Sequence, residues 1–191
     1  MSRAHTPSQV SRRLYVGLAS VSAVFAAITI FTRLEDGALA LAVWGGYLVA
    51  LGVVSSAVLV SLGRPARWWT WWIGSVFTAI AVGIFTLVFA GSASVALLTW
   101  SIAVWSVLAG ATSIVQGLRL DKGSVIRSDW TTIGGGTLFL GLLVLIVPPE
   151  VYWLMGLAGV WAAMMTVFVI IAALSARSAE ADKNGGMEAG S

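Results

Sequence analysis

Six long apolar segments alternate with short polar connections along the chain. Each segment approaches or exceeds the roughly 20 residues that a helix needs to cross the hydrocarbon of a bilayer. None of them contains Asp, Glu, Lys, Arg or His. The segments are 14–32, 38–62, 71–90, 94–118, 131–148 and 151–175. This pattern predicts an all-α polytopic membrane protein with six transmembrane helices.

The connections between these segments alternate in character. Three are tight turns with Gly or Pro, at 33–37, 91–93 and 148–150, and they hold only one basic residue, Arg33. The other two connections and both tails hold the remaining ten Lys and Arg residues. These are Arg3, Arg12, Arg13, Arg64, Arg67, Arg119, Lys122, Arg127, Arg177 and Lys183. Since Lys and Arg accumulate in cytoplasmic loops, both termini of this multi-pass membrane protein are predicted to lie in the cytoplasm.

The expected organisation follows from these boundaries. Residues 1–13 form a cytoplasmic tail, and 14–177 form the transmembrane domain. Residues 178–191 are polar and Gly-rich and are expected to be a disordered cytoplasmic tail. The first segment is too long for the apolar region of a signal peptide and lacks a small-residue cleavage site, so it is expected to be retained.

The sequence also repeats itself at intervals of about 57–60 residues. Near the start of the odd segments lie Gly17, Gly74 and Gly134, which are 57 and 60 residues apart. In the even segments Tyr47, Trp105 and Trp161 are 58 and 56 residues apart, and a Gly follows five residues later in the first two. The pattern predicts three helical hairpins, at 14–62, 71–118 and 131–175. Because each hairpin holds two spans, the repeats are expected to be parallel.

Small residues recur every four positions and suggest close helix packing, with a narrow pore as the alternative. The stripes are Ala19/Ala23/Ala27, Ser75/Ala79/Gly83, Ala109/Ser113/Gly117 and Gly52/Ser56. Gly134, Gly135 and Gly136 predict either a very close helix contact or a hinge.

Several aromatic residues are expected to mark the membrane interfaces, where an amphipathic ring is favoured. They are Trp68, Trp69, Trp71, Trp72, Trp130, Tyr152 and Trp153. An aromatic cage for a cation or a sugar is the alternative interpretation of the Trp cluster.

Composition supports a membrane protein and narrows its chemistry. Apolar residues make up 59% and charged residues 10% of the chain, with a mean hydropathy of +0.94, whereas soluble domains carry about 25% charged residues. There is no Cys, and the only His is His5. Disulfides, thiolate nucleophiles and metal sites built on Cys or His are therefore excluded. The net charge of +3 resides in short loops, which argues against nucleic-acid binding.

No arrangement of nucleophile and base can be assembled from these residues, so no catalytic, cofactor-binding or metal-binding residue is expected and the protein is expected not to be an enzyme. Gln116 is the most polar group within a span, and it is expected to hydrogen-bond a neighbouring helix or reach the interface. Thr78, Thr99, Thr112 and Thr166 are expected to bond to their own helices. The adjacent carboxylates Glu35 and Asp36 are either a pH-sensing pair or an ordinary exposed turn.

The chain resembles the HdeD-like family of bacterial acid-resistance membrane proteins, which consist of repeated two-helix units. The resemblance covers about residues 14–177 and rests on the stretches 105–110, 116–119 and 130–134, and on Gly141, Pro148 and Trp161. It implies a small inner-membrane protein linked to acid or envelope stress, and it transfers no catalytic residue.

Three functional hypotheses follow. The first is a non-enzymatic membrane protein of HdeD type that supports acid or envelope stress tolerance. The second is a small transporter or channel subunit with a pathway lined by Ser, Thr and Gly, and the third is an accessory subunit of a larger membrane complex. The lipid bilayer is the expected partner, and association with a second copy or with another membrane protein is left open.

Overall fold

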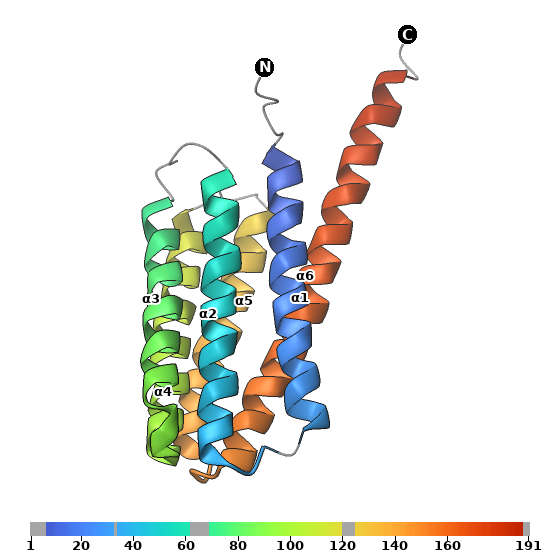
Figure 1. The fold of residues 1–191 in the computed structure, drawn as a ribbon. Helices are drawn as coiled ribbons and strands as arrows, with labels where there is room; N and C mark the ends of the chain where they lie inside the picture. Colours follow the sequence, from blue (N-terminus) through green and yellow to red (C-terminus); the bar gives the residue numbers. More distant parts are fainter. Residues whose placement is uncertain (1–6, 33, 62–68, 120–124, 189–191) are drawn as a thin grey trace.

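The computed structural model describes residues 7–32, 34–61, 69–119 and 125–188, and these form an all-α bundle of six α-helices and one short 3-10 turn. The helices are α1 (Pro7–Phe31), α2 (Gly37–Ser61), α3 (Trp69–Val88), η1 (Ala90–Ser92), α4 (Val95–Arg119), α5 (Val125–Ile146) and α6 (Val151–Glu188). Neighbours in sequence run in opposite directions, so that α2, α4 and α6 share one direction (Figure 1). The two ends of the chain therefore lie at the same end of the bundle.

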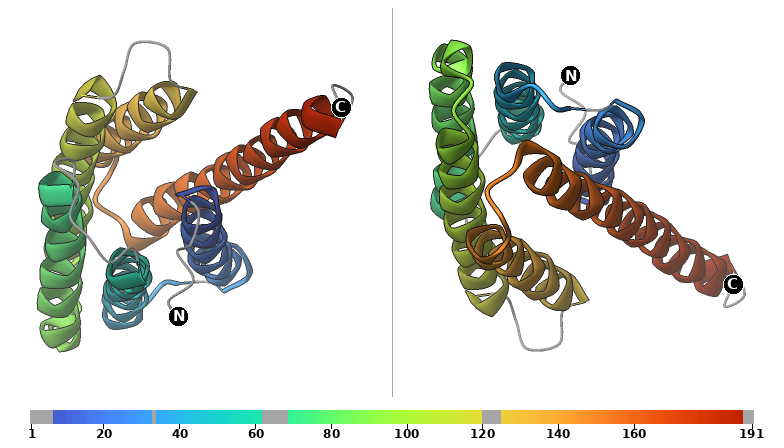
Figure 2. Two further views of the ribbon diagram at one scale, coloured as in Figure 1. Left: turned by 90° about the horizontal axis from the view of Figure 1, so that it is seen from above. Right: turned by 90° about the horizontal axis from the view of Figure 1, so that it is seen from below.

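The helices form a ring in which the closest partners come from different predicted hairpins (Figure 2). The most extensive contacts join α4 to α5, α1 to α6 and α2 to α3. Contacts within each predicted hairpin, between α1 and α2, α3 and α4, or α5 and α6, are smaller. Each even helix thus packs chiefly against the odd helix that follows it, and α6 closes the ring on α1.

Small residues allow these close contacts. A Cβ atom added at Gly110 would lie 2.7 Å from the backbone nitrogen of Leu138 and 2.8 Å from the carbonyl oxygen of Gly134. A Cβ at Gly45 would lie 2.9 Å from the carbonyl oxygen of Gly83 on α3. A Cβ at Gly159 on α6 would clash with the side chain of Thr29 on α1. Backbones approach this closely only where no side chain stands between them, as is common for helices associating in lipid.

The repeated glycines do not share one role. Gly17 faces Val54 on α2, Gly74 faces open space, and Gly134 faces Gly110 on α4. In the Gly-rich run, Gly134 and Gly136 lie close to α4 and to the ring of Trp161, while α5 continues as a helix through all three positions. The close-contact interpretation is therefore confirmed for two of the three glycines.

We expect Gly110→Ala to lower the free energy of unfolding by about 1–3 kcal/mol, because the added methyl group would push α4 and α5 apart. Gly135→Ala is the matched control, since a Cβ there meets nothing within 4 Å. The control should be neutral or slightly stabilising, since Ala favours a helix by up to about 1 kcal/mol over Gly. Unfolding in detergent followed by circular dichroism measures both, and equal effects of the two substitutions would contradict this packing.

Three helices are long and apolar enough to cross a membrane, over Gly37–Ala57, Val95–Arg119 and Val151–Ile171. These belong to α2, α4 and α6. The described apolar parts of α1, α3 and α5 are shorter, at Val16–Phe31, Ile73–Val88 and Trp130–Ile146. By length and composition, three of the six predicted spans, all in the even helices, could thus cross a membrane.

Some predicted boundaries are wrong. Helix α6 runs to Glu188, so residues 178–188 of the tail expected to be disordered are helical; Ala, Glu and Lys favour a helix there and no Pro interrupts it. Helix α5 begins at Val125, six residues before the predicted span, and α1 begins at Pro7. Residues 189–191 lie outside the described part of the chain. So do the basic residues Arg3, Arg64, Arg67 and Lys122.

The starts of α2 and α4 are capped by side chains at corresponding positions. The Ala38 backbone N–H donates to Oδ1 of Asp36 at 2.9 Å, and the Leu97 backbone N–H donates to Oγ of Ser94 at 3.3 Å. These bonds satisfy backbone donors that have no partner within the helix. Helix α6 begins after Glu150, whose carbonyl oxygen accepts the first backbone bond of that helix, from the Leu154 N–H at 3.1 Å.

Asp36→Ala should destabilise the protein by about 1 kcal/mol, because the first turn of α2 loses its capping oxygen. Glu35→Ala, at the exposed neighbouring carboxylate, should change stability little. Thermal unfolding of both variants in one detergent tests the difference, and Asp36→Asn should retain most of the stability. A larger loss for Glu35→Ala would show that the cap is not the stabilising feature.

Candidate functional site

The even helices form a closely packed inner layer. Nine of their side chains are at most 1% exposed and recur at the spacing of 58 and 56 residues already seen for the repeated aromatics. They are Ala40, Leu98 and Leu154; Trp44, Ile102 and Ala158; and Leu48, Ser106 and Ala162. This layer, almost wholly apolar, packs the half of the bundle nearest the short turns.

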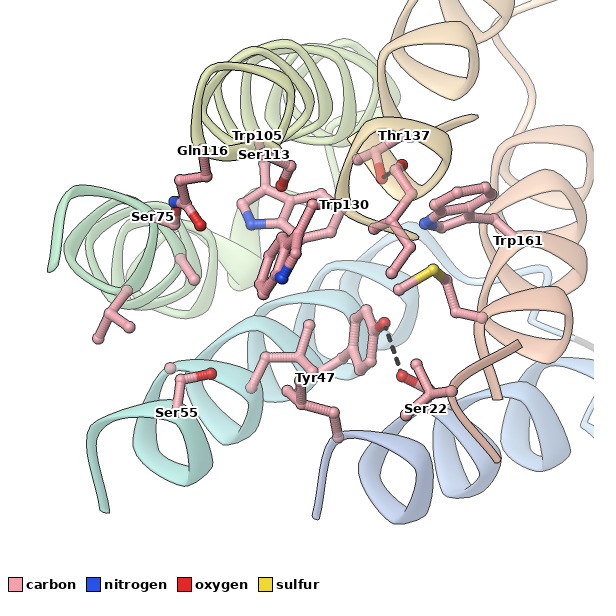
Figure 3. A pocket seen from close by; sticks show the side chains of 18 residues that line it. Ser22, Tyr47, Ser55, Ser75, Trp105, Ser113, Gln116, Trp130, Thr137 and Trp161 are labelled. Carbon is pink, nitrogen blue, oxygen red and sulfur yellow. Dashed lines mark hydrogen bonds between the residues drawn. The ribbon is translucent and has the colours of Figure 1, made fainter. Parts of the chain in front are cut away.

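In the other half, nearer the chain termini, the helices surround a cavity of about 140 Å³ (Figure 3). All six α-helices contribute to its wall. The lining residues are Leu18, Ser22, Tyr47, Leu51, Gly52, Ser55, Ser75, Val76, Ala79, Trp105, Ser113, Gln116, Trp130, Ile133, Thr137, Trp161, Met165 and Val169. The cavity lies directly above the inner layer, so it is closed on the side of the short turns.

Corresponding positions of the three hairpins meet in this cavity. Tyr47, Trp105 and Trp161 come from the even helices. So do Ser55, Ser113 and Val169, at the same spacing. On the odd helices Ser22, Ala79 and Thr137 line the wall at intervals of 57 and 58 residues. The second and third odd helices thus align at an interval of 58 residues at the cavity, whereas Gly74 and Gly134 suggested an interval of 60 residues.

An aromatic cluster connects the inner layer to the cavity wall. The rings of Trp44 and Trp105 meet edge to face at 5.5 Å, and Phe25 stacks on Tyr47 with centroids 4.1 Å apart. The hydroxyl oxygens of Tyr47 and Ser22 are 3.3 Å apart and form a hydrogen bond between α1 and α2. These contacts fix the Tyr47 ring at the edge of the cavity.

Tyr47 also lines a second, more open hollow of about 440 Å³ on the outer side of α1 and α2. That hollow is almost wholly apolar, with Val24, Ile28 and Val43 among its walls. The Tyr47 side chain, held by Ser22, thus stands between the central cavity and an outward-facing apolar groove.

Several polar side chains of the wall are hydrogen-bonded within the protein. The Gln116 side chain is 9% exposed and makes no hydrogen bond with any described residue. The hydroxyls of Ser113 and Thr137 instead donate to carbonyl oxygens of their own helices, each at 2.7 Å. Each hydroxyl hydrogen is therefore already used in a hydrogen bond, and the oxygen lone pairs can still accept a hydrogen bond from a molecule in the cavity. The wall therefore offers acceptors from hydroxyls and both donors and an acceptor from an amide.

The structure gives two of the polar and aromatic residues a position that the sequence did not indicate. Gln116 faces the cavity and does not bond to a described neighbouring helix. Trp130 lies in the second turn of α5 and lines the cavity, so it does not only mark an interface. Tyr152 and Trp153 are 68% and 50% exposed near the start of α6, where an interfacial role fits. The cluster at 68–72 lies outside the residues whose side chains are described.

The other polar expectations are resolved by hydrogen bonds. Thr78, Thr99, Thr112 and Thr166 all donate to carbonyl oxygens of their own helices, as predicted. Asp36 caps α2, which gives it a structural role that the pattern of charges did not reveal. The stripes of small residues divide between packing, as at Gly83 and Gly117, and the cavity wall, as at Ser75 and Ser113.

Two polar atoms of the inner layer lack a partner among the described residues. They are Nε1 of Trp44 and Oγ of Ser106. A buried hydroxyl with no hydrogen bond costs about 1–3 kcal/mol. By contrast, Ser101 on the same helix donates to the Leu98 carbonyl oxygen at 2.9 Å.

This contrast predicts opposite effects of two similar substitutions. Ser106→Ala should leave stability unchanged or raise it by about 1 kcal/mol, since it removes an unsatisfied group. Ser101→Ala should lower stability by about 0.5–1.5 kcal/mol, because a hydrogen bond is lost. Unfolding curves of the two variants in detergent measure both effects. The prediction is wrong if Ser106→Ala is the more destabilising substitution.

Within the described part of the chain, no charged side chain lines the cavity, and no group of three or more His, Asp or Glu side chains could hold a metal ion. No family model matches the sequence, and no curated protein and no solved structure matches it either.

Proposed function

We propose that the chain is a six-span integral membrane protein, built from three similar hairpins, with both termini in the cytoplasm. The three candidate spans α2, α4 and α6 run in the same direction, and only α3 and α5 connect them (Figure 1). If the even helices cross a bilayer, α3 and α5 must cross it in return. Their lengths of 20 and 22 residues correspond to about 30 Å or more at 1.5 Å per residue.

Helix α1 completes the six spans by its packing and its surface. It lies along α6 and exposes large apolar side chains outward, among them Val24, Ile30 and Phe31. The outward faces of α3 and α5 are similar, with Phe77 72% and Phe139 63% exposed. Apolar surface of this extent around a whole bundle favours lipid over water as its surroundings.

The charges of the described helix ends agree with the proposed orientation. Arg119 and Arg127 lie at the end that carries the termini, whereas Glu35, Asp36 and Glu150 lie at the opposite end. The basic end is the one that the positive-inside rule assigns to the cytoplasm.

Single-Cys labelling tests this orientation without background, because the natural chain has no Cys. Ser92→Cys and Glu150→Cys should react with a membrane-impermeant maleimide on intact cells. Arg119→Cys should react only after the membrane is permeabilised. Reaction of Arg119→Cys on intact cells would reverse the orientation, and equal reaction of all three would rule out the six-span arrangement.

For the function itself we propose a non-enzymatic role in tolerance of acid or envelope stress, as the resemblance to the HdeD-like family implies. The observation that supports it is the uncharged interior: Arg119, at the very end of α4, is the only Asp, Glu, Lys, Arg or His in the described apolar spans. A fall in external pH therefore adds no proton to a carboxylate or imidazole within the bundle, and the packing of the inner layer is unaffected. Such a bundle stays folded where proteins with buried titrating groups lose stability.

Survival after acid challenge tests this role. A deletion strain should survive less well than the same strain complemented with the natural protein. Complementation with a variant that fails to pack, such as Gly110→Val, should not restore survival. Equal survival of the deletion and complemented strains would overturn the proposal.

A small transporter is the second candidate, favoured by the cavity. The inner layer closes the cavity toward the short turns, so the described conformation is not an open channel. Transport would need the even helices to separate at Trp44, Ile102 and Ala158. Solute flux into proteoliposomes tests this candidate, and flux unchanged by sealing substitutions in that layer would argue against it.

A further inference from the structure

The cavity near the termini has the features of a ligand site and not of a packing defect. Gln116 is nine-tenths buried, lines the cavity and has no hydrogen-bond partner among the described residues (Figure 3). The indole Nε1 atoms of Trp105 and Trp161 likewise make no hydrogen bond within the described part of the chain, although these rings are only 7% and 9% exposed. Polar groups that line a cavity without a protein partner are available to hydrogen-bond a molecule bound there.

The wall also offers acceptors. The hydroxyls of Ser113 and Thr137 donate to backbone carbonyls, which leaves their oxygen lone pairs facing outward from their helices. A ligand with one hydroxyl group can therefore donate to one of these oxygens and accept from the Gln116 amide or an indole N–H. A ligand with one N–H group can only donate, either to one of these oxygens or to the amide oxygen of Gln116. The complementary group is small, polar and uncharged.

Charge and size narrow the ligand further. None of the described residues that line the cavity is Asp, Glu, Lys, Arg or His, so an ionised molecule would find no counter-charge among them. The volume of about 140 Å³ is close to that of an engineered apolar cavity of roughly 150 Å³ that accommodates benzene. The rings of Tyr47, Trp105, Trp130 and Trp161 supply aromatic walls, which favour an aromatic guest by stacking or edge contacts.

We infer that this cavity binds a small uncharged aromatic molecule carrying one hydroxyl or N–H group, of the size of phenol or indole. The inference rests on the proposed membrane placement only for the route of access, which in that orientation is from the cytoplasmic half of the bilayer. Tyr47, between the cavity and the outer apolar groove, contacts both the bound molecule and the path from the lipid.

Binding is measured on the full chain in nanodiscs by isothermal titration calorimetry, with phenol and indole as probes. Empty nanodiscs give the correction for partitioning into lipid. Benzoate at pH 8 and benzyltrimethylammonium are the charged counterparts of similar size. Saturable binding of phenol or indole at one site per chain is expected, with much weaker binding of both ions.

Two substitutions locate the site. Gln116→Leu should weaken binding of the neutral probe by about tenfold, which corresponds to the loss of one hydrogen bond worth roughly 1.4 kcal/mol. Thr99→Val is the matched control, because Thr99 bonds to its own helix carbonyl at 3.0 Å but does not line the cavity. Circular dichroism verifies that both variants remain folded.

Each outcome decides the proposal. Tight binding of benzyltrimethylammonium in place of phenol would overturn it in favour of an aromatic cage for cations. Absence of saturable binding by the folded protein would overturn it as well, as would equal affinities of the Gln116→Leu and Thr99→Val variants. Acid survival and maleimide labelling do not depend on these titrations, so failure of the binding site and failure of the proposed function are distinguishable.

Discussion

The structure depends on the close approach of each even helix to the odd helix that follows it. Gly45 against Gly83, Gly110 against Gly134 and Gly159 against Thr29 set the distance between helix backbones at three places around the ring. In lipid there is little hydrophobic gain from bringing helices together, so such packing contacts carry much of the association. Because these pairs join different hairpins, the three units hold each other in a closed ring and do not act as independent hairpins.

The cavity is a consequence of this ring. Near the short turns, Trp44, Ile102 and Leu154 fill the space between the even helices completely. Nearer the termini the same helices carry Ser55 and Ser113 at corresponding positions, and these small side chains leave a space surrounded by aromatic rings. One repeated arrangement thus produces a sealed layer and a cavity in adjacent turns.

The same arrangement explains the absence of charge from the interior. Buried charges would have to be paired or hydrogen-bonded in a region without water, at considerable cost. The polar groups that are present, such as Thr137 and Ser113, satisfy their hydroxyl hydrogens within their own helices. Gln116 lines the cavity without a hydrogen-bond partner among the described residues, whereas Nε1 of Trp44 and Oγ of Ser106 lack partners within the inner layer.

The sequence by itself determined the helical class, the number of helices and the spacing of the repeated aromatics, because apolar run length and residue spacing are local properties of the chain. It did not determine which face of a helix Trp130 or Gln116 presents, nor that Asp36 caps α2, nor how far α6 continues. Only the tertiary structure decided that Tyr47, Trp105 and Trp161 meet around one cavity. That meeting depends on contacts between segments 56 or more residues apart, and the hydrophobic pattern, which is nearly uniform around each helix, does not specify them.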